Sequence, residues 1–305
     1  MLLVLSFAVP VFAGTGTITV SGVAPEVVSI AIMPSGGSGN LSAIDVYTWY
    51  DVKVVVSDTD KLTDIKRLEL RMFQTSWSET FDKERRYGFK WYCNAPEWQS
   101  LGASGWTDPD AEYFAVAGSS KPSDMSATEG TWTFQVRLAK VAHYTTGGSW
   151  TIEAYVWDKS DNQAWRSNNF DVNLFIELIV TASITFEATP GDSNKTQNSP
   201  PFEIDYRANC IAKIMIQASD PTSTFGDSFS ADNLLIDDDE SPNTDARCQK
   251  LSGSAADWWT GLPVAGTPDP ANKDAWWFVS VPAGQPTGTY TFTYTMTIDF
   301  DQLAT

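Results

Sequence analysis

Two short acidic turns carry the most recognisable chemistry in this sequence. Asp58, Asp60 and Asp64 lie between two apolar, β-branched runs, and Asp158 and Asp161 follow another such run. Carboxylate oxygens are the ligands that Ca²⁺ prefers, roughly six to eight of them in flexible geometry. In an immunoglobulin-like sandwich both turns would lie at the same pole. The pattern therefore predicts a calcium site; the alternative is that each Asp only caps its turn through backbone hydrogen bonds.

A denser acidic run, Asp237-Asp238-Asp239-Glu240 with Asp245 nearby, is a second candidate for calcium. Consecutive carboxylates repel one another, and such runs are typical of solvated loops. We therefore rank this run below the two acidic turns as a cation site.

Catalytic machinery is not recognisable in the sequence. His143 is the only histidine, and the motifs of serine hydrolases, zinc proteases and P-loop enzymes are absent. Two carboxylates could still converge to cleave a glycoside, but nothing selects a pair among the 38 acidic residues. We expect that the protein is not an enzyme and rank a hydrolase last among its functions.

The length and patterning of the chain favour two all-β domains. The 305 residues suffice for two cores, and helical periodicity is scarce. We expect tandem immunoglobulin-like β-sandwich domains over residues 14–178 and 179–305. Strands are predicted over 46–56, 65–73, 87–93, 132–141, 150–157, 170–186, 202–206, 212–218, 234–237, 275–281 and 289–299. Residues 94–129, rich in Gly, Ser, Pro and Asp, are predicted to form a long excursion suited to binding.

The net charge of −18 disfavours negatively charged binding partners. Binding to phosphates requires Lys and Arg to displace counterions, so nucleic acid is not expected as a partner, and neither is an anionic membrane surface. The acidity fits solubility, cation binding or a saline medium.

The first 13 residues resemble a signal peptide. Their apolar run ends in Val11-Phe12-Ala13, which suits a signal peptidase, and it is far shorter than the roughly 20 residues that span a bilayer. We therefore predict a secreted, extracellular or cell-surface protein without a transmembrane anchor. The alternative is that the segment is retained as an apolar strand docked into a neighbour.

The next segment, residues 14–22, has the pattern of a strand for assembly. Thr15, Thr17, Ile18, Thr19 and Val20 form a period-two run flanked by glycines. Such an arm can add to the open sheet edge of another copy, and head-to-tail repetition of that contact makes a filament. The alternative is that the run is the first strand of its own domain.

Cysteine and asparagine positions give two further predictions. In an oxidising compartment Cys210 and Cys248 could pair within the second half, leaving Cys93 single. Asn40 and Asn194 each begin an N-glycosylation motif in a polar loop.

The 13 tryptophans raise the possibility of glycan binding. Flat aromatic faces can stack on sugar rings. Adjacent residues of a strand point to opposite faces, so in Trp258-Trp259 and in Trp276-Trp277 one ring should enter the core and one should face outward. Core packing explains most of the tryptophans, and contact between subunits ranks ahead of glycans for the rest.

Several segments together resemble secreted archaeal surface proteins with tandem immunoglobulin-like domains. The segments are 52–73, 87–93, 131–142, 149–163, 186–192 and 276–295. The resemblance implies a subunit of an S-layer, sheath or extracellular filament. We expect a structural subunit that assembles with copies of itself through donor-strand addition and calcium; the alternative is a cell-surface adhesin or glycan-binding module.

Overall fold

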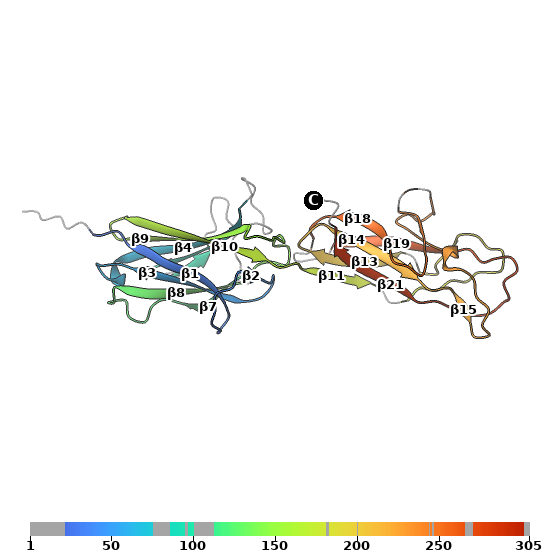
Figure 1. The fold of residues 1–305 in the computed structure, drawn as a ribbon, viewed down its shortest axis with the longest axis horizontal. Coiled ribbons are helices and arrows are strands. Elements are labelled where there is room, and N and C mark those ends of the chain that lie inside the picture. The colour runs from blue at the N-terminus through green and yellow to red at the C-terminus, as the bar shows by residue number, and fades with distance from the viewer. Residues whose placement is uncertain are drawn as a thin grey trace, which may run out of the picture.

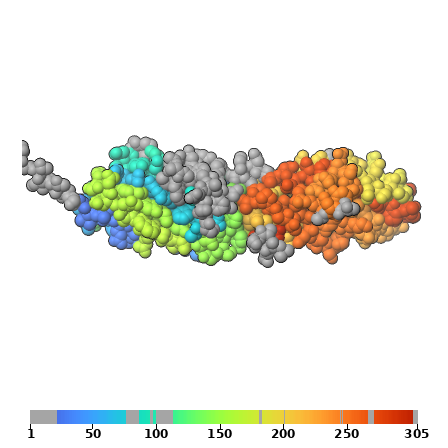
Figure 2. All heavy atoms as spheres, turned by 90° about the horizontal axis from the view of Figure 1, so that it is seen from above, coloured from blue at the N-terminus to red at the C-terminus, as the bar shows by residue number. Residues whose placement is uncertain are grey.

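The computed structural model describes residues 22–75, 86–94, 97–100, 113–180, 183–199, 201–243, 245, 247–265 and 271–301. These residues form strands and two short 3₁₀ helices, η1 (Leu62–Asp64) and η2 (Ala231–Asn233). The strands gather into two bodies that lie end to end along a rod (Figures 1 and 2). The predicted all-β class is confirmed. The predicted signal segment 1–13 and the assembly residues Thr15, Thr17, Ile18, Thr19 and Val20 lie outside the described residues.

The first body consists of two sheets that enclose one core. One sheet has the order β1 (Glu26–Pro34), β3 (Tyr50–Ser57), β8 (Glu129–Val136), β7 (Phe114–Ser120). The other has the order β2 (Ala43–Ile44), β10 (Gln163–Val172), β9 (Trp150–Asp158), β4 (Ile65–Gln74), β5 (Arg86–Tyr92), β6 (Trp98–Ser100). Neighbouring strands are antiparallel except for the parallel pair β2 and β10.

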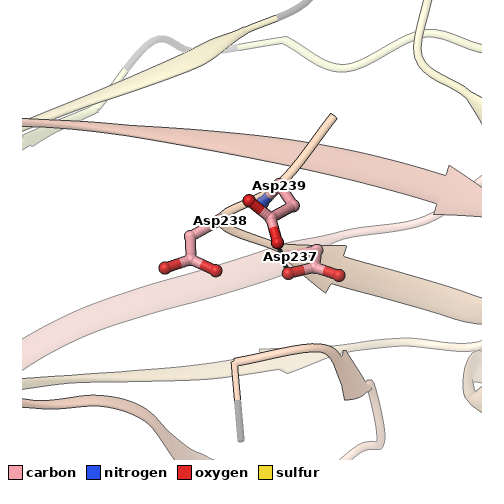
Figure 3. A group of neighbouring side chains, drawn as sticks. All are labelled: Asp237, Asp238 and Asp239. Atoms are coloured by element: carbon pink, nitrogen blue, oxygen red, sulfur yellow. Dashed lines mark hydrogen bonds between the residues drawn. The ribbon is translucent and has the colours of Figure 1, made fainter. Parts of the chain in front are cut away.

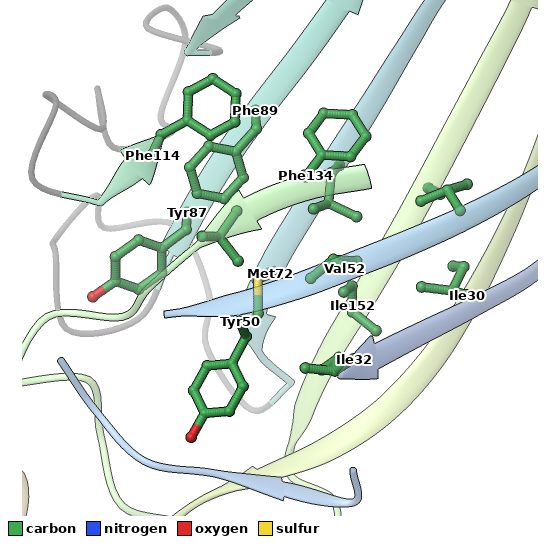
Figure 4. Close-up of a cluster of buried hydrophobic side chains, with 14 of the residues drawn as sticks. Ile30, Ile32, Tyr50, Val52, Met72, Tyr87, Phe89, Phe114, Phe134 and Ile152 are labelled. Carbon is green, nitrogen blue, oxygen red and sulfur yellow. The ribbon is translucent and has the colours of Figure 1, made fainter. Parts of the chain in front are cut away.

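Period-two patterning builds this core. Along β3 every second residue is buried, and Val52, Val54 and Val56 have no exposed surface. β-branched side chains fit such a pleated surface, and a slip of one residue would turn them all outward. Ile30 and Ile152 approach the same core from β1 and β9 (Figure 4).

The second body has a second core and three sheets. Its largest sheet has the order β11 (Ile176–Val180), β13 (Phe202–Ala208), β19 (Ala271–Val279), β16 (Leu234–Asp237), β17 (Gln249–Lys250), with β12 (Lys195–Thr196) also pairing with β19. Facing it is the order β18 (Ala256–Leu262), β14 (Ala212–Ala218), β21 (Tyr294–Phe300). A short ladder, β15 (Thr222–Ser223) with β20 (Tyr290–Thr291), lies at the end away from the first body (Figure 1).

The main strands of both bodies follow one order. Leaving out the two- and three-residue strands together with β5 and β18, which add to the outer side of β4 and β14, the first, second, fifth and fourth strands along the chain make one sheet, β1-β3-β8-β7 and β11-β13-β19-β16. The sixth and third strands pair in the other sheet, as β9 with β4 and as β21 with β14. In the first body a seventh strand, β10, flanks β9; among the described residues of the second body nothing pairs with the corresponding edge of β21.

The long predicted strand 170–186 is divided in the structure. β10 ends at Val172, and β11 begins at Ile176 and pairs along its whole length with β13. The predicted boundary at residue 178 therefore falls inside a strand of the second body.

A buried asparagine joins the two bodies. Asn209 has no exposed surface, and its side-chain amide donates to the carbonyl oxygens of Ala142 (3.0 Å) and Asn173 (2.9 Å). Its side-chain oxygen accepts from the Phe175 N–H (2.8 Å), and its carbonyl accepts from the Tyr144 N–H (2.8 Å). Because buried polar groups must be satisfied, these bonds fix how the two bodies meet.

Candidate functional site

The first predicted acidic turn begins with a buried carboxylate. Asp58 follows β3 and is only 2% exposed. Its Oδ1 accepts the Asp60 N–H at 2.8 Å, which is the expected turn-capping bond. Its Oδ2 is also buried and has no hydrogen-bond partner among the described residues. Burial raises the pKa of Asp58, and the nearby carboxylates of Asp64, Asp60 and Asp158 raise it further.

The second acidic turn is fully satisfied. Asp158, at the end of β9, has no exposed surface, and its Oδ1 accepts the N–H groups of Ser160 and Asn162 at 2.8 Å each. The Asn162 side-chain amide donates to Oδ2 at 2.7 Å. Asp161 forms an exposed ion pair with Lys66. In this turn capping accounts for the Asp158 carboxylate, and the ion pair with Lys66 accounts for that of Asp161.

The chain enters the first body between the two acidic turns. The Val23 N–H donates to Asp60 Oδ2 at 2.7 Å, and the Asn162 amide donates to the Gly22 carbonyl at 3.3 Å. A Cβ atom on Gly22 would lie 3.2 Å from Asp60 Oδ2 and 3.5 Å from Asp64 Oδ2. The turns are also joined by a bond from the Lys159 N–H to the Asp64 carbonyl at 2.9 Å. The structure therefore brings the predicted acidic residues to one pole, which we call the N-terminal pole.

The second acidic run forms the tightest acidic cluster in the described part of the chain. Carboxylate oxygens of Asp237, Asp238 and Asp239 all lie within 4.8 Å of one another (Figure 3), which is closer than the carboxylates of the N-terminal pole approach. Asp237 is buried, but its oxygens accept the N–H groups of Asp239 (3.3 Å) and Asn243 (3.0 Å). Its carboxylate thus caps a turn, as Asp158 does.

The predicted disulfide is not formed. Cys210 and Cys248 are both free thiols in the structure. Cys210 is buried just before β14, whereas Cys248 precedes β17 in the facing sheet and lies beside the Asp237 carboxylate. Burial raises the pKa of each thiol to about 11, with Asp299 contributing for Cys210 and Asp237 for Cys248. The prediction was wrong because sequence spacing does not show where the two thiols lie: Cys210 packs into the second core, and Cys248 lies beside Asp237.

The free edge of β21 exposes an apolar face. Tyr294, Met296, Ile298 and Phe300 alternate with exposed polar residues and are only partly buried against the second core. β9 occupies the equivalent place in the first body, and its inward residues Trp150, Ile152, Ala154 and Val156 are at most 1% exposed. The second core is therefore less completely covered than the first.

A groove lies just before the start of β21, at the end of the rod away from the first body. It has a volume of about 510 Å³ and is lined mainly by residues 184–190 and 286–292. Within 184–190, Ile184, Phe186 and Ala188 turn toward the core while Thr185 and Glu187 are exposed, the alternation of a strand. No strand ladder includes residues 183–189 in the described part of the chain. We call this feature the distal groove.

An aromatic ladder covers the outer face of the first body. The rings of Trp157 and Trp165 stack on Tyr155, with centroids 5.9 and 6.1 Å away and planes inclined by 20° and 21°. The guanidinium of Arg67 lies 3.7 Å from the Trp157 ring centroid, and that of Arg71 lies 4.4 Å from Tyr155. Trp165, 58% exposed, ends the ladder. Sequence reasoning missed this surface because it is assembled from β4, β9 and β10.

The two tryptophan pairs behave differently. In β19, Trp277 is buried and Trp276 is half-buried, as the alternation predicts. In β18, Trp258 and Trp259 are 3% and 7% exposed, so the prediction of an outward ring was wrong there. The pairing with β14 shifts register between Ile214 and Met215, and this bulge breaks the alternation.

Both predicted glycosylation sites are exposed. Asn40 and Asn194 lie in loops, and the Asn40 side-chain oxygen accepts the Ile32 N–H at 2.9 Å. Occupancy of these sites remains a prediction.

Comparisons with known proteins give no family. No family model matches the chain, and no curated protein matches it. Among solved structures, a DUF4466 family protein from Parabacteroides merdae has a TM-score of 0.26 at 6% identity, covering 85% of this chain and 100% of its own. A C-terminal fragment of the major pilin GBS80 of Streptococcus agalactiae has a TM-score of 0.23 at 10% identity, covering 92% of each chain. Scores this low do not establish a shared fold.

In the described part of the chain, no helix has the length and apolar character needed to cross a bilayer.

Proposed function

We propose that this protein is a structural subunit of an extracellular filament or cell-surface layer, built from two tandem immunoglobulin-like domains. In this proposal the N-terminal segment of one copy completes the second domain of the next copy. The observation that carries it is the edge of β21 with which no described residue pairs, in a strand that begins at the distal groove.

The strand order supports the immunoglobulin-like assignment. Such sandwiches pair their first, second, fifth and fourth strands in one sheet and their third, sixth and seventh in the other. The first body has all seven, with β10 as the last. The described part of the second body has six, and the free edge of β21 is the place of the seventh.

The polarity of the missing strand matches a donor from another copy. β21 runs from the distal groove toward the junction, where Phe300 contacts Tyr144. A seventh strand would be antiparallel to β21, as β10 is to β9. An N-terminal segment that entered from the distal end of the rod would lie with residue 22 outermost and residue 14 nearest the junction, which is the required direction.

The other wall of the groove fits the same arrangement. In the first body the seventh strand also pairs in parallel with β2. In the second body residues 183–189 are extended and run from the junction toward the distal end. One side of 183–189 is already bonded to Asn198, whose N–H donates to the Thr185 carbonyl and whose side-chain oxygen accepts the Glu187 N–H. A donor strand would lie between the other side of this segment and β21, and main-chain hydrogen bonds give such additions their affinity.

The donor has the side chains that this gap requires. Within 14–22, Ile18 and Val20 lie on one face of the predicted strand and Thr17 and Thr19 on the other. Ile18 and Val20 would cover Met296 and Ile298, whereas the threonines would face solvent. Burying two such apolar side chains stabilises the contact by about 1.5–3 kcal/mol each.

A second copy is the donor because the chain enters its own first body at the opposite end. Gly22 lies at the N-terminal pole, whereas the distal groove is lined in part by β20, which pairs with β15 at the other end of the rod (Figure 1). A contact between opposite ends of identical copies is heterologous and does not close, so it propagates into a filament.

The test places one charge on either face of the donor strand. Ile18→Asp is expected to abolish filaments, because it would bury an unpaired carboxylate against the apolar face of β21. Thr17→Asp adds the same charge one residue away on the solvent face, so filaments should persist. Negative-stain electron microscopy and sedimentation of the full chain give the readout. Filaments that survive Ile18→Asp, or equal loss in both variants, would contradict the proposal.

A glycan-binding adhesin is a second candidate because Trp165 offers an exposed ring at the end of the aromatic ladder. Most ladder faces are already covered by neighbouring rings or guanidinium groups, so this site is small. In a glycan array, Trp165→Ala should remove binding that Ile18→Asp retains. An array with no bound glycan for the unmodified protein would eliminate this candidate.

A further inference from the structure

We propose that Asp58, Asp60 and Asp64 form a calcium site that anchors the incoming chain at Gly22 to the N-terminal pole. The site requires one copy only and does not depend on assembly.

The first observation is the unpartnered oxygen of Asp58. A buried carboxylate without a full set of donors is costly, and an isolated case in a folded protein calls for an explanation such as an ion. Asp58 is 2% exposed, and its Oδ2 has no hydrogen-bond partner among the described residues. A bound cation would coordinate this oxygen. It would also offset the electrostatic repulsion between Asp58 and the neighbouring carboxylates.

A matched turn at the same pole shows what the missing partner would be. Asp158 is the last residue of β9 and Asp58 directly follows β3, and each caps the N–H two residues later. Four residues after Asp158, Asn162 supplies a backbone and a side-chain donor. Four residues after Asp58 stands Leu62, whose side chain is buried in the core and whose N–H donates to Ala127. The first turn therefore leaves Asp58 Oδ2 without a donor, whereas in the second turn the equivalent oxygen, Asp158 Oδ2, accepts a hydrogen bond from Asn162.

The remaining ligands surround that oxygen and the entry of the chain. The Asp60 and Asp64 carboxylates both lie beside Gly22, and their charges act on Asp58. Asp60 is exposed and Asp64 is half-buried, so their side chains can turn toward Asp58 Oδ2. Ser160 Oγ lies beside Gly22 as well and offers a neutral ligand.

The chemistry of these ligands favours calcium. All are hard oxygen donors on turns of irregular geometry, which suits the flexible coordination of Ca²⁺ better than the strict octahedron of Mg²⁺. Asp161 is not part of the site because Lys66 already pairs with it, and Asp158 is not because three donors occupy its oxygens. The predicted five-residue site is thus reduced to three carboxylates.

The test compares two acidic clusters in one protein. We would measure thermal unfolding of the full chain carrying Ile18→Asp, with and without CaCl₂, so that the sample is not a polymer. Calcium at about 100 times its Kd should raise the midpoint by roughly 5–10 °C. Asp58→Asn should remove this rise. Asp239→Asn, in the cluster that caps its own turn, is the matched control and should keep the rise.

A second readout protects the test against misfolding. Without calcium, Asp58→Asn should unfold at a higher temperature than its parent, because the amide is neutral and can donate to a neighbouring carboxylate. Asp64→Asn is the second variant and should also remove the calcium response. Three results would overturn the proposal. The midpoint of the protein with an unmodified N-terminal pole does not rise with calcium, the rise survives Asp58→Asn, or the rise is lost in Asp239→Asn.

Discussion

The two bodies of this protein differ most clearly in the neighbours of two equivalent strands, β9 in the first body and β21 in the second. β9 is flanked by β10 and β4, and its inward side chains are buried. Among the described residues β21 is flanked by β14 alone, and its inward side chains remain partly exposed. An open edge next to an apolar groove is a hazard for aggregation unless something covers it. The first body covers its core with described strands, and the proposed assembly would cover the second core with a strand from another copy.

Matched substitutions in β9 and β21 should reveal this difference most strongly. Ile152 is 1% exposed, so Ile152→Ala should lower the free energy of unfolding of the first body by about 2–5 kcal/mol. Ile298 is only partly buried, so Ile298→Ala should cost the second body about 1 kcal/mol in the Ile18→Asp background. Chemical denaturation of the two variants gives both values. Equal costs would show that the second core is as complete as the first.

Supplying the missing strand within one chain should remove the difference. A copy of residues 14–22, joined after Thr305 by a short Gly-Ser linker, would run from the junction toward the distal groove beside β21. In the Ile18→Asp background this addition should stabilise the second body, with each net kcal/mol raising its unfolding midpoint by about 2–8 °C. A copy in which the residue equivalent to Ile18 is Asp is the control. Equal unfolding midpoints for the two additions would contradict the claim that the second body lacks a strand beside β21.

The smallest expected effect concerns pH at the N-terminal pole. The raised pKa of Asp58 means that the folded state binds this proton more tightly than the unfolded state does. Its contribution to stability is therefore present below the unfolded pKa of about 3.9 and is lost as pH rises through the folded pKa. In calcium-free buffer, the advantage of Asp58→Asn over its parent should shrink as pH falls through that range. An advantage that stays constant with pH would contradict the assignment.

Elements with strong local patterns could be predicted from sequence. Predicted strands 65–73 and 150–157 correspond to β4 and β9 because apolar alternation along each strand directly reflects its buried face. The acidic turns were also placed at one pole, since the order of strands in a sandwich determines which turns meet. In these segments the apolar alternation in the sequence matches the buried face of the strand in the folded protein.

The rest depends on pairing that sequence does not show. The bulge in β18 buries both Trp258 and Trp259, and Cys210 and Cys248 remain free thiols in different surroundings. The aromatic ladder requires the register of β9 with β4 and β10. The free edge of β21 and the unpartnered oxygen of Asp58 are missing interactions, which become visible only when every neighbour has been placed.

Hydrogen exchange on the assembled protein tests the central claim most directly. Backbone amides in 294–300 and 183–189 would be compared between assembled wild-type protein and the Ile18→Asp variant. A donor strand should slow exchange in both segments and leave β9 unchanged, because β9 is already paired on both sides. Assemblies in which these two segments exchange as fast as in the variant would contradict the account.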